Sequence, residues 1–146
     1  MAETARTVQK LKSSLKVTQY DFDPDATTAT DIAWVDMRDY TSILIGFCRT
    51  VGTSALTFLI LANTESDGSG TDVTVKTVSP AAAPDAVGDH VWYEIDTESI
   101  IEAAGDADYR YVTANLAVAT AGDEGVVTYI RAGRHKQEDL TADVVA

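Results

Sequence analysis

Residues 40–61 read YTSILIGFCRTVGTSALTFLIL, and this stretch decides the fold class. It holds two long apolar runs, residues 42–51 and 54–61, which only Gly52-Thr53 separates. Each run carries Ile, Leu, Phe or Val at positions of both parities, as strands buried on both faces do. The stretch therefore predicts a central β-hairpin of an all-β domain.

Turn-forming residues divide the remaining chain into further short extended segments. Residues 67–70 (DGSG) and 122–125 (GDEG) each lie between two β-type runs and are expected to be hairpin loops. Alternation in the first segment changes phase between Val17 and Tyr20, which suggests a β-bulge there. Residues 80–89 contain two prolines without periodicity and are expected to form a surface loop. We expect strands near residues 15–23, 31–37, 42–51, 54–63, 72–79, 90–96, 108–120 and 125–134.

One segment has a helical pattern. Residues 97–104 (TESIIEAA) are followed by Gly105, a typical helix stop, and Thr97 is the expected N-cap. Eight strands with a single short helix favour an antiparallel β-sandwich of the jelly-roll kind over a parallel α/β sheet, which needs a helix between most strands. We expect a β-sandwich domain over 15–136, an extended basic arm at 1–14 and a tail at 137–146.

Composition restricts the function classes. The 146 residues are the size of one domain, and the formal net charge of -12 makes binding to nucleic acid or to an anionic membrane unexpected. Cys48 is the single cysteine, which excludes a disulfide within these residues and weakly favours a reducing compartment. No segment has the apolar length of a signal peptide or a membrane span, so a soluble protein is expected.

The charges are unevenly distributed. Residues 1–16 contain the cations Arg6, Lys10, Lys12 and Lys16 against the single acid Glu3, whereas the body is acidic. An arm of this composition is either disordered or laid on an acidic neighbour in an oligomer or assembly. A solvated tail that happens to be basic is the alternative interpretation.

Catalytic and metal-binding patterns are weak. His90 and His135 have no nucleophile at a recognisable spacing and are expected to be solvent-exposed polar residues. The acidic loops at 21–25 and 67–72 could offer oxygen ligands to Ca²⁺, but neither has the ligand spacing of an EF-hand, and solvated turns are favoured. We therefore expect no enzyme activity, no catalytic or metal residues and no cofactor.

Aromatic residues fall on the predicted strands. Trp34, Trp92 and most of the tyrosines are expected in the core or at subunit contacts, because strand aromatics usually pack rather than stack on sugars. In residues 109–112 (YRYV) the two tyrosines share one face and Arg110 lies on the other. Arg110 is expected to meet a buried or interfacial carboxylate, since cations are rare in the body.

Three short motifs carry a family resemblance: residues 40–43 (YTSI) entering a buried strand, residues 65–68 (ESDG) after the next strand, and residues 109–112 (YRYV) in a late strand. Across 40–132 the chain resembles small all-β structural proteins of tailed bacteriophages, above all the capsid decoration (cement) proteins of HK97-type heads. The resemblance implies a sandwich body, often trimeric, that clasps neighbouring major capsid subunits and reaches across the seam with a terminal arm. The loop at 80–89 is longer than in some relatives, which leaves strand pairing there open.

The leading hypothesis is a non-enzymatic decoration protein on the capsid surface of the virion, made in the host cytoplasm. Its expected partners are the major capsid protein and further copies of itself, with a trimer favoured. The alternative is a carbohydrate-binding or adhesion module of a phage head or tail fibre, which would use exposed Trp or Tyr on a concave sheet. We assign the interface to cations at both ends and in the late strands: Arg6, Lys10, Lys12, Lys16, Arg110, Arg131 and Arg134.

Overall fold

The computed structural model describes residues 15–24, 27–78 and 83–133. In these ranges the chain forms nine strands and one helix, α2 (Thr97–Ala104). The strands are β1 (Leu15–Phe22), β2 (Thr30–Asp31), β3 (Val35–Asp36), β4 (Ser42–Val51), β5 (Leu56–Asn63), β6 (Val73–Thr77), β7 (His90–Asp96), β8 (Tyr111–Val118) and β9 (Glu124–Ala132). The predicted arm at 1–14 and tail at 137–146 lie outside the described residues.

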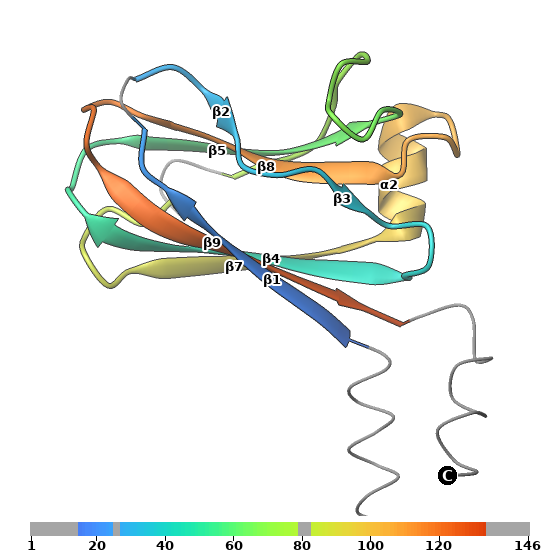
Figure 1. Ribbon diagram of the computed structural model, residues 1–146, viewed down its shortest axis with the longest axis horizontal. Helices are drawn as coiled ribbons and strands as arrows, with labels where there is room; N and C mark the ends of the chain where they lie inside the picture. The colour runs from blue at the N-terminus through green and yellow to red at the C-terminus, as the bar shows by residue number, and fades with distance from the viewer. Residues whose placement is uncertain (1–14, 25–26, 79–82, 134–146) are drawn as a thin grey trace, which may run out of the picture.

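Two antiparallel sheets lie one above the other (Figure 1). The four-stranded sheet has the order β1-β9-β4-β7, and the five-stranded sheet has the order β2-β8-β5-β6 with β3 also paired to β8. Because β2 and β3 pair one after the other with the same strand, they act as one interrupted strand. Consecutive strands then alternate between the sheets in the jelly-roll manner, except for β5 and β6, which are neighbours in one sheet. The predicted all-β antiparallel sandwich with one short helix is confirmed.

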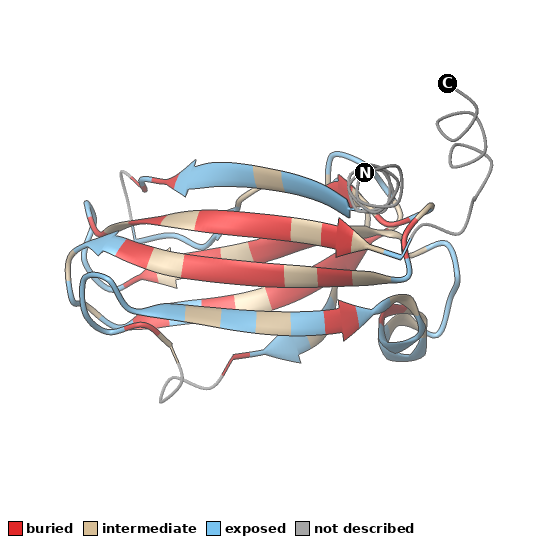
Figure 2. Ribbon diagram, turned by 90° about the horizontal axis from the view of Figure 1, so that it is seen from below, coloured by how far each residue is buried: buried red, intermediate tan, exposed pale blue. Residues whose placement is uncertain are grey.

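The core fills the space between the sheets. Each of β4, β5, β8 and β9 points alternate side chains inward, and these are almost fully buried (Figure 2). Tyr129 is buried among them, and its hydroxyl accepts a hydrogen bond from the backbone N–H of Ala114 in the opposite sheet at 2.9 Å. Burial raises the pKa of the Tyr129 phenol, so the hydroxyl stays neutral and serves as a fixed link between the sheets.

The predicted central hairpin at 42–61 is wrong. β4 pairs with β7 and β9, whereas β5 pairs with β6 and β8 in the other sheet. A register shift between Arg49 and Val51 and the positive φ of Gly52 (83°) turn the chain from one sheet to the other. The predicted hairpin at 122–125 fails for the same reason, since it joins β8 to β9. The loop at 67–70 does join two paired strands, β5 and β6, as predicted.

Three local predictions need correction. The first strand has an unbroken register from Leu15 to Phe22 and therefore no bulge. The strand predicted at 31–37 is interrupted, because Trp34 leaves it to pack against Gly68. Asp96 rather than Thr97 caps α2, accepting a hydrogen bond from the Ser99 N–H at 2.6 Å. The helix range and its stop at a left-handed glycine are as predicted.

A buried ion pair holds the two sheet-crossing turns together. The side chain of Arg49 is 1% exposed, and its Nη1 lies 2.8 Å from Oδ2 of Asp123. The same guanidinium donates to the carbonyl oxygens of Ser54 at 2.7 Å and Pro84 at 3.0 Å. Asp123 Oδ2 also accepts from the Ser54 N–H and hydroxyl, and these bonds, the hydroxyl foremost, lower the pKa of the carboxyl. The turn after β4, the turn before β9 and the segment before β7 thus share one polar cluster.

Replacing Arg49 by Met should destabilise the fold strongly, because Asp123 and two carbonyl oxygens lose their cation. Removing one partner of a buried ion pair typically costs roughly 3–5 kcal/mol of unfolding free energy, which chemical denaturation would measure. Arg38→Met is the matched control. Arg38 is 59% exposed and lies 3.8 Å from Asp36, so its loss should cost no more than about 1 kcal/mol. Equal losses for the two variants would contradict this account.

Candidate docking surface on the four-stranded sheet

The described interface cations gather near one end of the sandwich. Lys16 is exposed and lies opposite Arg131 in the β1–β9 pairing. Arg131 is buried, donates to the Asp36 carbonyl oxygen at 2.8 Å and lies over the ring of Tyr40. Arg110 Nε lies 3.5 Å from Oδ1 of Asp36, which is a partly exposed carboxylate and not the buried or interfacial one that was predicted. Arg6, Lys10, Lys12 and Arg134 lie outside the described residues.

Through these contacts Arg110 and Arg131 hold parts of their own chain together. Arg110 donates to the Tyr111 hydroxyl at 2.7 Å, and this bond is the main cause that raises its pKa. Together with Arg131 it anchors β3 at Asp36 to the ends of β8 and β9. Of the three described cations, Lys16 therefore has the side chain most available to a partner, and an interface role for all three stays a prediction.

The outer face of the four-stranded sheet is apolar, which the sequence analysis did not single out. Paired residues of antiparallel strands share a face, and the β1–β9–β4 register places Val17, Ile130 and Leu44 in one row across the sheet. Val17 is 57% exposed, Trp92 44% and Leu15 36%, and the other members are half-buried. We call this set the apolar face: Leu15, Val17, Leu44, Cys48, Trp92, Val126 and Ile130.

Trp92 lies flat against the sheet. It is opposite Gly46 in the β4–β7 register, and a Cβ added to Gly46 would lie 2.4 Å from Cε3 and Cζ3 of the indole. The indole ring therefore fills the space that a side chain at position 46 would occupy. One ring face covers the β4 backbone, and the side chain keeps nearly half of its surface exposed.

Polar residues also stand on this face, and three of the seven are acidic: Gln19, Asp21, Ser42, His90, Glu94, Asp96 and Thr128. Gln19 donates to the Thr128 hydroxyl at 3.0 Å in the middle of the sheet. Asp21 and Glu94 stand at its two edges, on β1 and β7. No Lys or Arg projects from this face within β1, β4, β7 and β9. An apolar surface with basic groups at its margin would complement it.

The outer face of the five-stranded sheet is partly covered by its own chain. Trp34 packs against Gly68, whose added Cβ would lie 2.2 Å from the indole Nε1. Thr113 is fully buried beneath this region although its strand position faces outward. Side-chain hydrogen bonds Asn63 to Asp72 (2.6 Å) and Asn115 to Asp31 (2.8 Å) satisfy the polar groups nearby. The two outer faces therefore differ: one is partly covered and carries hydrogen-bonded polar side chains, and the other is open and more apolar.

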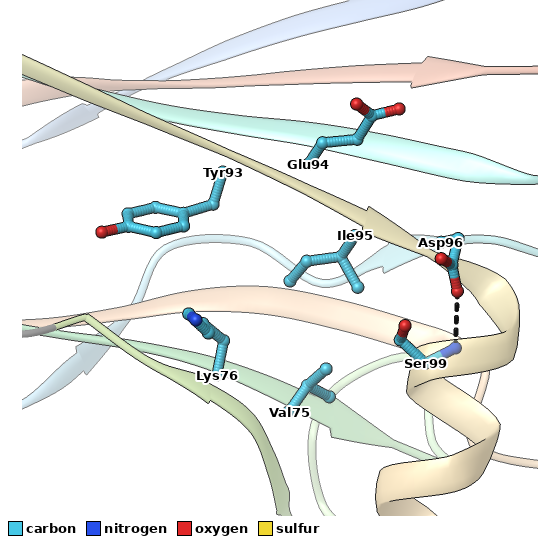
Figure 3. Close-up of a pocket in the computed structure, with 7 residues that line it drawn as sticks. All are labelled: Val75, Lys76, Tyr93, Glu94, Ile95, Asp96 and Ser99. Carbon is cyan, nitrogen blue, oxygen red and sulfur yellow. Dashed lines mark hydrogen bonds between the residues drawn. The ribbon is translucent and has the colours of Figure 1, made fainter.

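A cleft of about 260 Å³ lies where the β6 and β7 edges meet α2 (Figure 3). Asp96 is committed to the helix cap, and that bond lowers its pKa. Lys76 Nζ lies 5.7 Å from the centre of the Tyr93 ring. Ser99 lies beside Asp96, but this carboxylate caps the helix and no histidine is among the lining residues, so they form no Ser–His–acid constellation. The lining residues are Val75, Lys76, Tyr93, Glu94, Ile95, Asp96 and Ser99.

The remaining chemical candidates do not assemble into a site. His90 is exposed, as predicted, and His135 lies outside the described residues. Within the described ranges no three His, Cys, Asp or Glu side chains form a group that could hold a metal ion. In the same ranges no helix has the length and apolarity needed to cross a bilayer.

Comparison with known proteins bears on the fold. No family model matches the sequence, and no curated protein matches it. A structure described as "Bacillus endospore appendages form a novel family of disulfide-linked pili" is similar with a TM-score of 0.52 at 16% identity, covering 82% of this chain and 87% of that one. At this identity the likeness shows a shared fold alone.

Two further structures are less similar. The SPBc2 prophage-derived protein YomS has a TM-score of 0.46 at 14% identity, over 82% of this chain and 95% of that one. A carbohydrate-binding module of endoglucanase Cel5A from Eubacterium cellulosolvens has a TM-score of 0.42 at 16% identity, over 84% and 99%.

Gly46→Ala should displace the Trp92 indole, because the new methyl group would occupy the space of the six-membered ring. We expect a red shift of tryptophan emission towards that of a solvated indole, with the far-ultraviolet circular dichroism unchanged. Trp92→Phe is the reference, because it shows which part of the emission comes from Trp92 and which from Trp34. An unchanged emission spectrum of the Gly46 variant would show that the ring does not rest on this glycine.

Proposed function

We propose that this protein is a non-enzymatic structural protein of a tailed-phage virion, which decorates the assembled head and stabilises contacts between major capsid subunits. The observation that carries the proposal is the apolar face: one outer sheet face is partly covered by its own chain, whereas the other exposes Val17, Trp92 and Leu15. Exposed contiguous apolar surface on a small protein marks a contact with a partner.

The size of the surface fits attachment to a large scaffold. Fully burying a Val, Leu or Ile side chain stabilises by roughly 1.5–3 kcal/mol relative to exposure, and the members of the apolar face are partly exposed. Docking would thus supply several kcal/mol before the entropy cost of association. A protein that binds only the assembled shell stabilises that shell in proportion to its occupancy.

Charge supports the same proposal. The apolar face has acidic edges at Asp21 and Glu94, so it suits a partner with basic groups around an apolar patch. The basic arm of residues 1–16 would then contact an acidic neighbouring surface, either the shell or another copy of this chain. Covalent linkage of the kind named for the Bacillus pili is not proposed, because continuous disulfide linkage needs two cysteines per subunit and this chain has Cys48 alone.

Leu44→Lys tests the docking face with heads produced from the genome that encodes the chain. A cation in the middle of the apolar face should weaken head binding at least tenfold, which corresponds to about 1.4 kcal/mol. Thr57→Lys is the matched control, with the same new charge on the exposed β5 residue of the other outer face. Co-sedimentation with heads measures both, after circular dichroism has shown that both variants fold. Equal binding of the two variants would exclude this face.

The second candidate is a carbohydrate-binding or adhesion module, which one observation favours. The indole of Trp92 keeps nearly half of its surface exposed near Glu94 of the same strand, and aromatic faces can stack on sugar rings. On the leading proposal a broad glycan array gives no signal. The outcome that favours the second candidate is reproducible glycan binding that Trp92→Ala abolishes and Trp34→Phe retains. In that case sugar recognition would replace head decoration as the proposed function.

A further inference from the structure

The outer face of the four-stranded sheet is laid out in rows that start at the end where the chain enters β1. The register gives a first row of Leu15, Ala132, Ser42 and Asp96, and a second row of Val17, Ile130, Leu44 and Glu94. In both rows the charged residue stands on β7, and β1, β9 and β4 contribute uncharged side chains. This end of the face is therefore a mostly apolar track with two carboxylates at its far side.

The face lacks positive charge. Its acidic residues have no Lys or Arg beside them on the same face within β1, β4, β7 and β9. Lys16 follows Leu15, but it pairs with Arg131 and shares the parity of the buried Ile43, so it points to the other side of the sheet. A segment that suits this face supplies both apolar side chains and cations. The same face of a second copy does not, because it would bring further carboxylates against these.

The residues that precede β1 have the composition that this face requires. Residues 1–14 carry three cations against one acid. Within them, residues 8–12 (VQKLK) place Val8 and Leu11 beside two of those cations. Apolar and basic side chains thus occur together in the part of the segment nearest to the sheet.

The length of this segment and the place where it joins the sheet also fit. Leu15 is the first residue of β1 and stands in the first row of the face, so the segment starts at the corner of the track. Neighbouring strands lie about 4.8 Å apart, so β7 lies about 14 Å from β1 across the sheet. An extended chain spans about 3.3 Å per residue, which brings Leu11 within reach of β4 and Lys10 within reach of Glu94 on β7.

We propose that in the free protein residues 8–14 of each chain fold back over the first two rows of its own apolar face. Leu11 then lies on the apolar track, and Lys10 and Lys12 lie beside the carboxylates of β7. The covalent connection favours the chain's own segment over that of another copy, because a short tether gives an effective concentration in the millimolar range. Covering the face also removes apolar surface through which free copies could associate.

The contact has a consequence for docking, and this step alone rests on the proposed function. A head that binds the apolar face would displace residues 8–14 from it. The released cations would then be free to contact an acidic surface of the shell or of a neighbouring copy. Docking of the face and engagement of the basic arm would thereby be coupled.

A spin label on the segment tests the contact in the free protein. We would attach a nitroxide to Gln9→Cys in a Cys48→Ser background, so that the introduced thiol is the only one. Amide signals of a 15.6 kDa chain can be followed individually by nuclear magnetic resonance. The signals of Leu44 and Glu94 should lose more than half of their intensity relative to the reduced label. The signal of Thr57, on the outer face of the other sheet, should keep most of its intensity.

A pair of charge variants tests what holds the segment in place. Glu94→Lys sets a cation against Lys10 and Lys12, so it should restore most of the lost intensity at Leu44. Glu102→Lys is the matched control, with the same charge change at an exposed residue of α2, and it should restore little. Both residues are exposed, so both variants should keep the fold. Raising the salt concentration should act in the same direction as Glu94→Lys, because it screens exposed charge pairs.

A mixing experiment separates the chain's own segment from that of another copy. Isotope-labelled copies without the nitroxide are mixed with nitroxide-bearing copies without the isotope, so that only a contact between copies reduces the signals. We expect no loss in this mixture. A loss at Leu44 there would overturn the proposal in favour of a second copy, and equal signals of Leu44 and Thr57 in the singly labelled protein would overturn it in favour of an uncovered face. No heads are present in these measurements, so the proposed function is tested separately.

Discussion

The ion pair between Arg49 and Asp123 is the interaction on which the arrangement of the two sheets depends. Arg49 ends the inward-facing row of β4, and its side chain binds Asp123, Ser54 and Pro84. Its backbone is fixed as well, through hydrogen bonds with the segment at 88–89. Three connections between sheets therefore meet at one guanidinium. A buried charge tolerates this position because each of its three nitrogens donates to an oxygen. At this cluster β4 and β5 cross between the sheets rather than form a hairpin.

The sequence predicted the strands and the helix that follow from local patterns, and it missed the features that depend on residues distant in the chain. Turn residues and alternation located β4, β7 and α2, and the strand count indicated a sandwich. Strand pairing was predicted wrongly where two kinds of turn use the same residues. A Gly-Thr or Gly-Asp sequence suits both a hairpin and a connection between sheets. Arg49 was read as part of an apolar run, since its partner Asp123 is 74 residues away. The sequence indicated the apolar face through the apolar residues on both faces of β4. The same pattern fits a strand that is buried on both faces and a strand with one face open to a partner.

The difference between the two outer faces links the fold to the proposed role. Trp34 and Trp92 look alike in the sequence, yet one is packed under a loop of its own chain and the other lies open on Gly46. The core, the Arg49 cluster and the Tyr129 bridge make the sandwich a rigid support. On that support the open apolar face is the surface that remains available to a partner.

Electron cryomicroscopy of heads from the genome that encodes this chain tests the central claim most directly, with particles prepared with and without the protein. We expect extra density on the outside of the shell that fits the sandwich, with the outer face of the β1-β9-β4-β7 sheet against capsid subunits. Density that contacts the shell through the loop-covered five-stranded sheet, or heads that show no added density at saturating protein, would contradict the account.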